Sequence, residues 1–194
     1  MTKVLLTGFE PFGTATSNPS GEIVKQISGD NIVTAILPVA YAQSAERLLA
    51  LIAEHNPGVV ISLGQAEGRT QITPERVAIN LDDARLADNE GVMRNDVKIL
   101  EDGPDAYFST LPIKEIVNAI QAKGIPAAVS LSAGAFLCNH VFYVAQNKFV
   151  GTGVRSGFIH VPLMDSQAPE FPGLPTMPLD QMVTAVRAML ETIS

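Results

Sequence analysis

The sequence contains only one cysteine, Cys138, so no disulfide can form within the chain. A signal-peptide pattern is also missing, because the apolar run that begins at Val4 is short and ends in the turn-like segment Gly8-Phe9-Glu10-Pro11. Both absences favour a reducing compartment, and we expect the protein to be cytoplasmic.

An excess of positive charge and a long apolar run are missing as well. The formal net charge is −7, whereas proteins that bind nucleic acids or anionic membranes gather lysine and arginine. No apolar run approaches the roughly 20 residues that span a bilayer. We therefore expect neither nucleic acid nor membrane as a partner. The 194 residues, 46% hydrophobic and 17% charged, suit one globular domain over residues 1–194.

Signatures of metal and nucleotide chemistry are absent too. The three histidines, His55, His140 and His160, show no HExxH or paired-ligand spacing. Neither a GxGxxG motif nor a GxxxxGKS or GxxxxGKT phosphate loop occurs. We expect no metal site and no cofactor.

The chain does contain short apolar, β-branched runs that alternate with segments of helical spacing. The predicted strands are Lys3–Thr7, Ile32–Leu37, Val59–Leu63, Arg76–Leu81, Ala127–Leu131 and Gly157–Val161. Apolar residues three and four apart predict helices around 45–52, 113–120 and 179–193, with Pro112 placed for a first helical turn. This alternation predicts an α/β fold: a three-layer α/β/α sandwich with a mostly parallel, twisted central sheet.

Functional sites in such folds lie in the loops that follow the carboxyl ends of the strands. Four regions qualify here: residues 8–18, 64–75 and 132–138, and the neighbourhood of His160. A long segment, Asp82–Phe108, carries many charges and little periodicity. The sequence leaves open whether this segment is a surface excursion or a loop that covers the site.

Cys138 is the candidate nucleophile. Small residues and Gly134 give way here to a helix-like apolar run, which places the thiol in the first turn of a helix. Unpaired N–H groups and the positive end of the helix dipole favour a thiolate at that position. The alternative is a buried, inert thiol, which is the usual state of a lone cysteine.

A nucleophilic cysteine needs a base within hydrogen-bond reach and a carboxylate that orients the base. His160 follows a predicted strand, so it is either that base or a structural histidine bonded to the backbone. His140 is a poor base, because on a helix it would lie about 200° around from Cys138. Three glutamates in strand-end loops compete on equal terms for the carboxylate: Glu10, Glu67 and Glu75.

A series of motifs then extends along nearly the whole chain. In order they are LLTGFEPFG at 5–13 with NPS at 18–20, GQAEGR at 64–69, QITPERVAINL at 71–81, DNEG at 88–91, LPIK at 111–114, GIPAAVS at 124–130, CNH at 138–140 and GFIHVP at 157–162. Together they resemble the pyrrolidone-carboxylate peptidases (pyroglutamyl-peptidase I), a family of cytoplasmic cysteine peptidases.

The resemblance implies a cysteine omega-peptidase that hydrolyses the amide bond after an N-terminal pyroglutamyl (5-oxoproline) residue. It implies that Cys138 attacks the carbonyl and forms a thioacyl-enzyme, that His160 moves the proton, and that Glu75 orients the imidazole. Arg85 would hold the oxyanion together with the backbone N–H of Cys138. The resemblance also implies N-terminally pyroglutamylated peptides as partners and a homotetramer as the assembly.

The substrate itself suggests the pocket. Pyroglutamate is a flat, uncharged lactam without a free amine, so a carboxylate anchor would stay unpaired at a cost. An apolar slot suits it, with an amide such as that of Gln65, which is able to donate and accept at once. By the resemblance, the slot is lined by Phe9, Phe12, Asn18 and Gln65, with Phe136 and Leu137 as further walls.

Two other functions stay open at this point. Analogy of fold alone suggests a nucleoside-phosphorylase-like transferase, and loss of turnover would leave a module that only binds the lactam. The sequence departs from the family pattern at Glu67, at Ala135 and at Asp82-Asp83, and the segment between Cys138 and His160 is short. These departures bear on loop geometry and subunit contacts.

Overall fold

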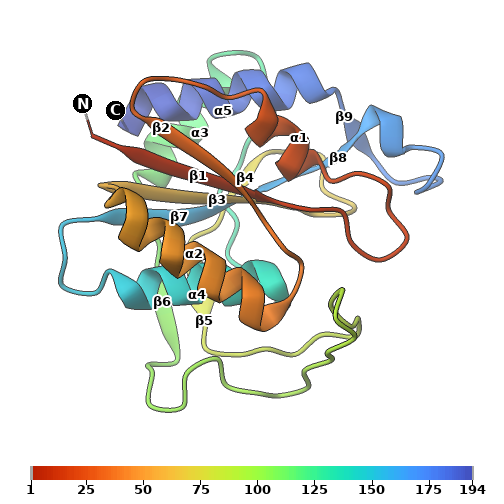
Figure 1. Cartoon of the computed structure of the whole chain (residues 1–194). Coiled ribbons are helices and arrows are strands. Elements are labelled where there is room, and N and C mark those ends of the chain that lie inside the picture. The colour runs from red at the N-terminus through yellow and green to blue at the C-terminus, as the bar shows by residue number, and fades with distance from the viewer. Residues whose placement is uncertain (1, 194) are drawn as a thin grey trace.

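The computed structural model describes residues 2–193, which form three layers with a sheet in the middle (Figure 1). Within these residues the central sheet has five strands in the order β2-β1-β3-β7-β4. Their bounds are Val4–Phe9 for β1, Ile32–Leu37 for β2, Val59–Gln65 for β3, Thr73–Pro74 for β4 and Arg155–Val161 for β7. The first four strands in this order pair in parallel, and β4 runs antiparallel to β7. The predicted α/β class and the mostly parallel sheet are confirmed.

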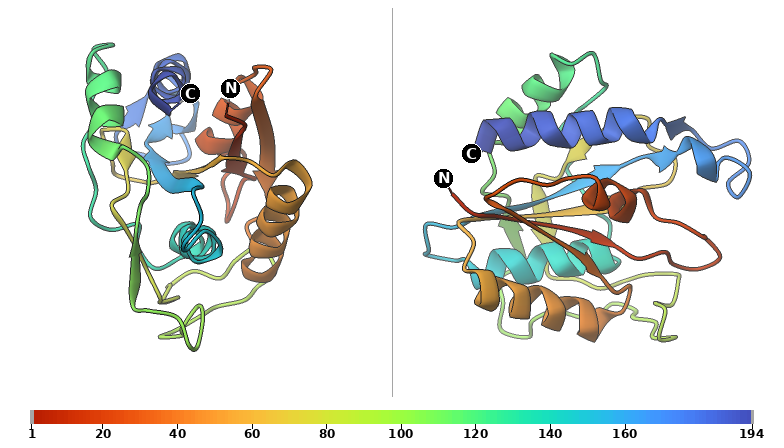
Figure 2. Two further views of the ribbon diagram at one scale, coloured as in Figure 1. Left: turned by 90° about the vertical axis from the view of Figure 1, so that its left-hand side faces the viewer. Right: turned by 45° about the horizontal axis from the view of Figure 1, so that its top comes forward.

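Helices cover both faces of this sheet, as the two views of Figure 2 show. The helices α1 (Pro19–Lys25), α3 (Ile113–Gln121) and α5 (Leu179–Ile193) share one hydrophobic core with the sheet. The helices α2 (Tyr41–His55) and α4 (Leu137–Lys148) share the other. Because both faces are covered, the central strands β1 and β3 read as continuous apolar runs rather than alternating ones.

The prediction of a strand at Ala127–Leu131 is wrong. This segment follows residues 72–76 through four backbone hydrogen bonds, but it makes only two isolated bridges, Ile72↔Ala127 and Glu75↔Ser130. Pro74 lies between the two bridges and has no N–H to donate, so the ladder is interrupted there. The run remains extended without becoming a regular strand.

The predicted strand at Arg76–Leu81 is found in shortened form and outside the central sheet. It is β5 (Val77–Ile79), which pairs antiparallel with β6 (Ala106–Phe108). A second small sheet joins β8 (Leu163–Met164) to β9 (Thr176–Met177) in parallel, with the short 3₁₀ helix η1 (Asp165–Gln167) between them. No helix within residues 2–193 is long and apolar enough to cross a bilayer.

Helix α1 lies in a region that the sequence analysis described only as turn-rich. The Asn18 side chain caps it by accepting a hydrogen bond from the Ser20 N–H, and Pro19 opens the first turn. Asn18 is therefore a buried, fully bonded cap, because its amide nitrogen also donates to the Glu10 carbonyl.

Candidate active site

His160 and Glu75 meet beside the carboxyl end of β7. His160 lies on β7 opposite Gly64 of β3, and Thr73 of β4 pairs with it from the other side. The chain continues from β4 to Glu75, whose N–H donates to the Phe158 carbonyl at 2.9 Å. The carboxylate oxygen Oε1 of Glu75 then lies 2.7 Å from Nδ1 of His160.

This pair is buried, and its geometry fixes the state of the imidazole. Glu75 is fully buried and His160 is 4% exposed. Because a carboxylate only accepts, the ring proton is on Nδ1, which leaves the Nε2 lone pair available as a base. The arrangement is that of an imidazole held in one tautomer by a carboxylate.

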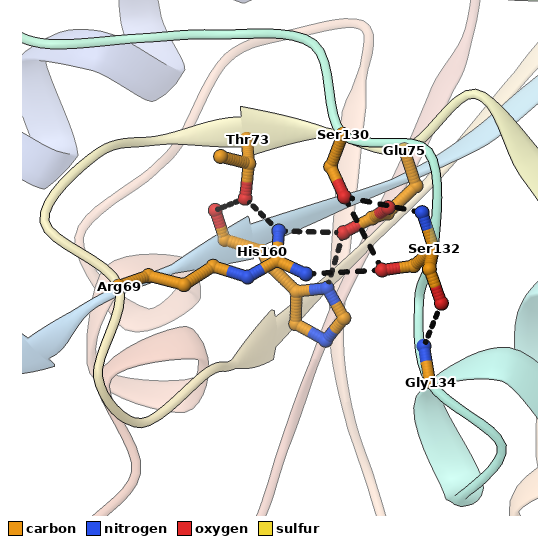
Figure 3. A network of polar contacts seen from close by, with 7 residues as sticks. All are labelled: Arg69, Thr73, Glu75, Ser130, Ser132, Gly134 and His160. Atoms are coloured by element: carbon orange, nitrogen blue, oxygen red, sulfur yellow. Dashed lines mark hydrogen bonds and ion pairs between the residues drawn. The ribbon is translucent and has the colours of Figure 1, made fainter.

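Arg69 is a third member of this network, as Figure 3 shows. Its Nη1 donates to the same Glu75 oxygen at 2.7 Å, and it also contacts the Thr73 hydroxyl. Its Nη2 donates to the Ser132 carbonyl at 3.0 Å. Arg69 therefore connects the buried carboxylate to the loop that leads to Cys138.

Cys138 lies in the first turn of α4, as the sequence predicts, and is partly buried. Its sulfur lies close over Gly64 of β3: a Cβ built on Gly64 would be 2.8 Å from Sγ and 2.7 Å from the Phe158 ring. Since Gly64 pairs with His160, the thiol lies over a residue that is directly beside His160 in the sheet. Only a glycine at position 64 leaves room for this approach.

The electrostatics favour a neutral thiol and a neutral imidazole in the free protein. Burial, followed by the Glu75 charge, raises the pKa of the Cys138 thiol to about 12, although Arg69 and the backbone act in the opposite direction. Burial also lowers the pKa of His160 below its usual 6.5, against the effect of Glu75. The expectation of a resting thiolate at the helix start is therefore wrong, because desolvation outweighs the helix terminus.

A pocket opens directly beside the thiol. It is small and is lined by Phe9, Phe12, Asn18, Val39, Gln65, Phe136, Leu137 and Cys138. All six residues that the sequence analysis proposed for the slot lie in its lining, together with the sulfur-bearing residue. The walls are mostly apolar, and the rings of Phe12 and Phe136 lie 6.2 Å apart. The pocket suits a small, flat, uncharged group.

Comparison with known proteins identifies a family that matches the chain. A family model described as "Pyroglutamyl peptidase" matches residues 2–194. The chain belongs to the pyroglutamyl peptidase family. A pyrrolidone-carboxylate peptidase of Cupriavidus pinatubonensis is 48% identical over 200 residues, which cover 99% of this chain and 93% of that protein.

Solved structures of the same family share the fold closely. The crystal structure of pyroglutamyl peptidase I from Bacillus amyloliquefaciens matches with a TM-score of 0.95 and 44% identity, covering 98% of this chain and 94% of that one. A mutant pyrrolidone carboxyl peptidase from Pyrococcus furiosus matches with a TM-score of 0.92 and 40% identity, covering 97% and 96%.

The long segment Asp82–Phe108 reaches the rim of the pocket of this family member. The Asn89 N–H donates to the carbonyl of Val39, a residue of the pocket wall, and its side-chain amide donates to Glu10 Oε1 and the Pro11 carbonyl. Glu10 in turn accepts from the Val39 N–H. The part around Asn89 thus supports the pocket wall at Val39 from outside, while much of the remainder is exposed.

The base of this segment is anchored by a second buried ion cluster. Oδ2 of Asp82 lies 2.8 Å from His140 Nδ1 and 2.7 Å from Arg94 Nη1. Arg94 also lies over the Tyr41 ring at 4.5 Å. His140 therefore anchors this segment and does not face Cys138, in agreement with its predicted place on the helix.

The competing carboxylates and the proposed oxyanion arginine lie elsewhere. Glu10 belongs to the pocket rim, and Glu67 is exposed. Arg85 is exposed and makes no hydrogen bond or ion pair with any residue in the range 2–193, although the nearby Asp83 N–H donates to the Ala135 carbonyl at 2.9 Å. Sequence reasoning missed Val39, and it considered Arg69 only as a possible surface ion-pair partner of Glu75; the position of Arg69 in a strand-end loop motif was the available signal for its role in the site.

Proposed function

We propose that this chain is a cysteine-type omega-peptidase that hydrolyses the amide bond after an N-terminal pyroglutamyl residue. The observation that carries the proposal is the buried Glu75–His160 pair next to a thiol that opens into a small apolar pocket. Membership of the pyroglutamyl peptidase family supports the substrate class.

Cys138 is the proposed nucleophile and His160 the proposed base. Because both groups start neutral, the thiol gives its proton to Nε2 of His160 as the sulfur attacks the substrate carbonyl. The tetrahedral intermediate then collapses, the imidazolium protonates the leaving amine, and a pyroglutamyl thioester remains on Cys138. Water, deprotonated by the same imidazole, hydrolyses the thioester and releases pyroglutamate and the free thiol.

Glu75 and Arg69 support the charge that appears during this cycle. The carboxylate holds the Nδ1–H and stabilises the imidazolium that forms. Burial lowers the pKa of His160, and the Arg69 charge beside Glu75 acts in the same direction, so the resting imidazole is unprotonated and ready to accept the thiol proton. No group has to be reorganised when the proton moves.

For the oxyanion we propose the backbone N–H of Cys138, assisted by Arg85. The first N–H groups of a helix have no carbonyl partner within the helix, and Cys138 is the second residue of α4. Arg85 follows a segment that bonds to the loop before Cys138. An exposed arginine there is free to close over a bound substrate.

The function is tested with a pyroglutamyl amide of a fluorescent amine. We expect turnover by the reduced protein and loss of turnover in Cys138→Ala or after thiol alkylation, with His160→Ala equally inactive. Gly153→Ala is a control, since a Cβ at Gly153 has no neighbour within 4 Å. Lactam-induced stabilisation without turnover would instead indicate a binding module, and nucleoside phosphorolysis that survives alkylation would indicate a transferase.

We also propose that the protein works as one peptidase domain, 1–194, in a cytoplasmic homotetramer without cofactor. Exposed apolar side chains support self-association, because such patches on a folded surface are commonly covered by a partner. Those on the long segment are Leu86, Val92, Met93, Val97, Leu100 and Phe108. Light scattering on the purified protein measures the assembly, and a monomer at micromolar concentration would contradict the tetramer.

A further inference from the structure

In the side-chain amide of Gln65, the oxygen is hydrogen-bonded and the nitrogen has no hydrogen-bond partner among residues 2–193. Gln65 is the last residue of β3 and lines the pocket. Its Oε1 accepts a hydrogen bond from Gln167 Nε2 at 3.0 Å. Its Nε2 is buried and has no hydrogen-bond partner within residues 2–193. A buried N–H without a partner is costly, so it marks a place where a bound acceptor is stabilised.

The orientation of this amide is set by Gln167, which is fully buried in the 3₁₀ helix η1. Oε1 of Gln167 accepts from the Met164 N–H at 3.0 Å, and its Nε2 donates to the Ser17 carbonyl at 3.2 Å. A backbone N–H only donates and a backbone carbonyl only accepts, so these two bonds determine which end of Gln167 is nitrogen. That nitrogen faces Gln65, which must therefore present its oxygen.

We propose that Gln167 is a positioning residue that fixes the Gln65 amide with its N–H₂ group toward the pocket, so that the pocket selects rings bearing a carbonyl acceptor. The inference rests on the proposed function and adds the reason for its selectivity. Two backbone groups fix the orientation of the Gln167 amide, the Gln167 amide fixes that of the Gln65 amide, and the Gln65 amide then determines which ligand atom can bind to it. The sequence suggested that the Gln65 amide both donates to the ligand and accepts from it. The structure leaves Gln65 as a donor to the ligand, because its oxygen already accepts from Gln167.

The chemical consequence is discrimination between five-membered rings. A lactam carbonyl pairs with the waiting Gln65 donor. A ring of the same shape without a carbonyl leaves that donor buried and unpaired, and sites of this kind reject such analogues strongly. If Gln65 presented its oxygen instead, two acceptors would face each other and the preference for a lactam would be lost.

The test compares two substrates in two variants. Gln167→Glu keeps the acceptor for the Met164 N–H, but the ionised side chain has no donor, so Gln65 turns its N–H₂ group toward it. Gln167→Met removes both bonds and leaves the Gln65 amide unfixed. The substrates are a pyroglutamyl amide and a cyclopentanecarbonyl amide of the same fluorescent amine, which differ only in the lactam. Gln181→Glu, on the exposed surface of α5, controls for the added charge.

We expect the ratio of the two kcat/KM values to fall about 10- to 100-fold in Gln167→Glu, mainly through KM for the pyroglutamyl amide. In Gln167→Met the ratio falls less. The ratio in Gln167→Glu recovers as the pH is lowered, because the protonated carboxyl regains a donor. Protonation of His160 does not affect the ratio, since both substrates depend on it. An unchanged ratio in both folded variants, or equal losses on both substrates, would overturn the proposal.

A second measurement needs no variant to fold. Adding 2-pyrrolidone to the ¹⁵N-labelled wild-type protein should shift the side-chain N–H₂ resonances of Gln65 and leave those of Gln167 in place. Shifts at Gln167 without shifts at Gln65 would contradict the assigned orientation. Absence of any pyroglutamyl hydrolysis by the wild-type protein would instead count against the proposed function, since 2-pyrrolidone binding reports on the amide independently of turnover.

Discussion

Replacing Gly64 with alanine tests whether the thiol acts from the place where the structure shows it. The added methyl would lie 2.8 Å from the Cys138 sulfur and 2.7 Å from the Phe158 ring. Favourable non-bonded contacts between heavy atoms lie at roughly 3.5–4.0 Å, so the sulfur and the ring must each give way by about 1 Å. The β3 backbone at Gly64 is restrained by its pairing with His160 of β7 and by the β1 pairing that extends to Ser62, so most of that movement falls on the side chains.

The size of the effect follows from this displacement. Forcing one methyl into a packed core costs about 1–3 kcal/mol of stability. A reacting atom displaced by about 1 Å loses roughly 10²-fold in rate. We therefore expect Gly64→Ala to fold with a reduced melting temperature and to lose about 100-fold in kcat toward a pyroglutamyl amide, with slower alkylation of Cys138.

Two glycine variants separate loss of stability from loss of chemistry. In Gly157→Ala, on neighbouring β7, the methyl would meet Leu111 and lie 2.6 Å from the Ser109 hydroxyl, and none of its close neighbours belongs to the site. It should destabilise the protein while the folded fraction keeps its kcat. Gly153→Ala should change neither property. Wild-type kcat in folded Gly64→Ala would refute the assigned position of the nucleophile.

Two further variants test the electrostatics of the site. Burial lowers the pKa of His160, with a smaller contribution of the same sign from the Arg69 charge, and the imidazole must be neutral to accept the thiol proton. In a plot of kcat/KM against pH, the fall on the acid side should therefore lie below pH 6.5 in the wild type and move to higher pH in Arg69→Met. If it does not move, the Arg69 charge does not affect the pKa of His160. Glu75→Gln removes the carboxylate charge that stabilises the imidazolium, and steady-state assays should show kcat reduced by roughly 10²- to 10⁴-fold with little change in KM.

Much of the fold follows from patterns that are local in the sequence. The apolar run at Val59–Leu63 forms a strand because parallel strands covered on both faces are nearly continuous apolar segments. The run at Ile32–Leu37 forms the edge strand β2, which is only partly buried. The failure at Ala127–Leu131 came from another part of the chain. Pro74, over 50 residues away, withholds the N–H that would have completed the ladder. The sequence of a single apolar run does not show which other segment of the chain it will pair with.

The candidate site could be predicted from the sequence about as well as the fold. The position of Cys138 in a first helical turn and the pocket lining were both expected, because each depends on residues near in sequence or on family motifs. The neutral state of the thiol was not, since desolvation is set by the packing of Phe158 and β3 around it. The role of Arg69 in the site was not predicted for the same reason: it depends on contacts in space with Glu75 and the Ser132 carbonyl.

The protein contains the same set of groups twice, and the two sets differ in what surrounds the imidazole. Glu75 and Asp82 are both fully buried, and each holds an imidazole Nδ1 and an arginine on one oxygen at 2.7–2.8 Å. The difference lies on the far side of each ring. His160 lies opposite Gly64, where the thiol and the pocket meet, whereas His140 packs edge-on against the Tyr41 ring. Both carboxylate–imidazole pairs have the same geometry, and under the proposed function only the pair beside Gly64 has a thiol and a pocket near it.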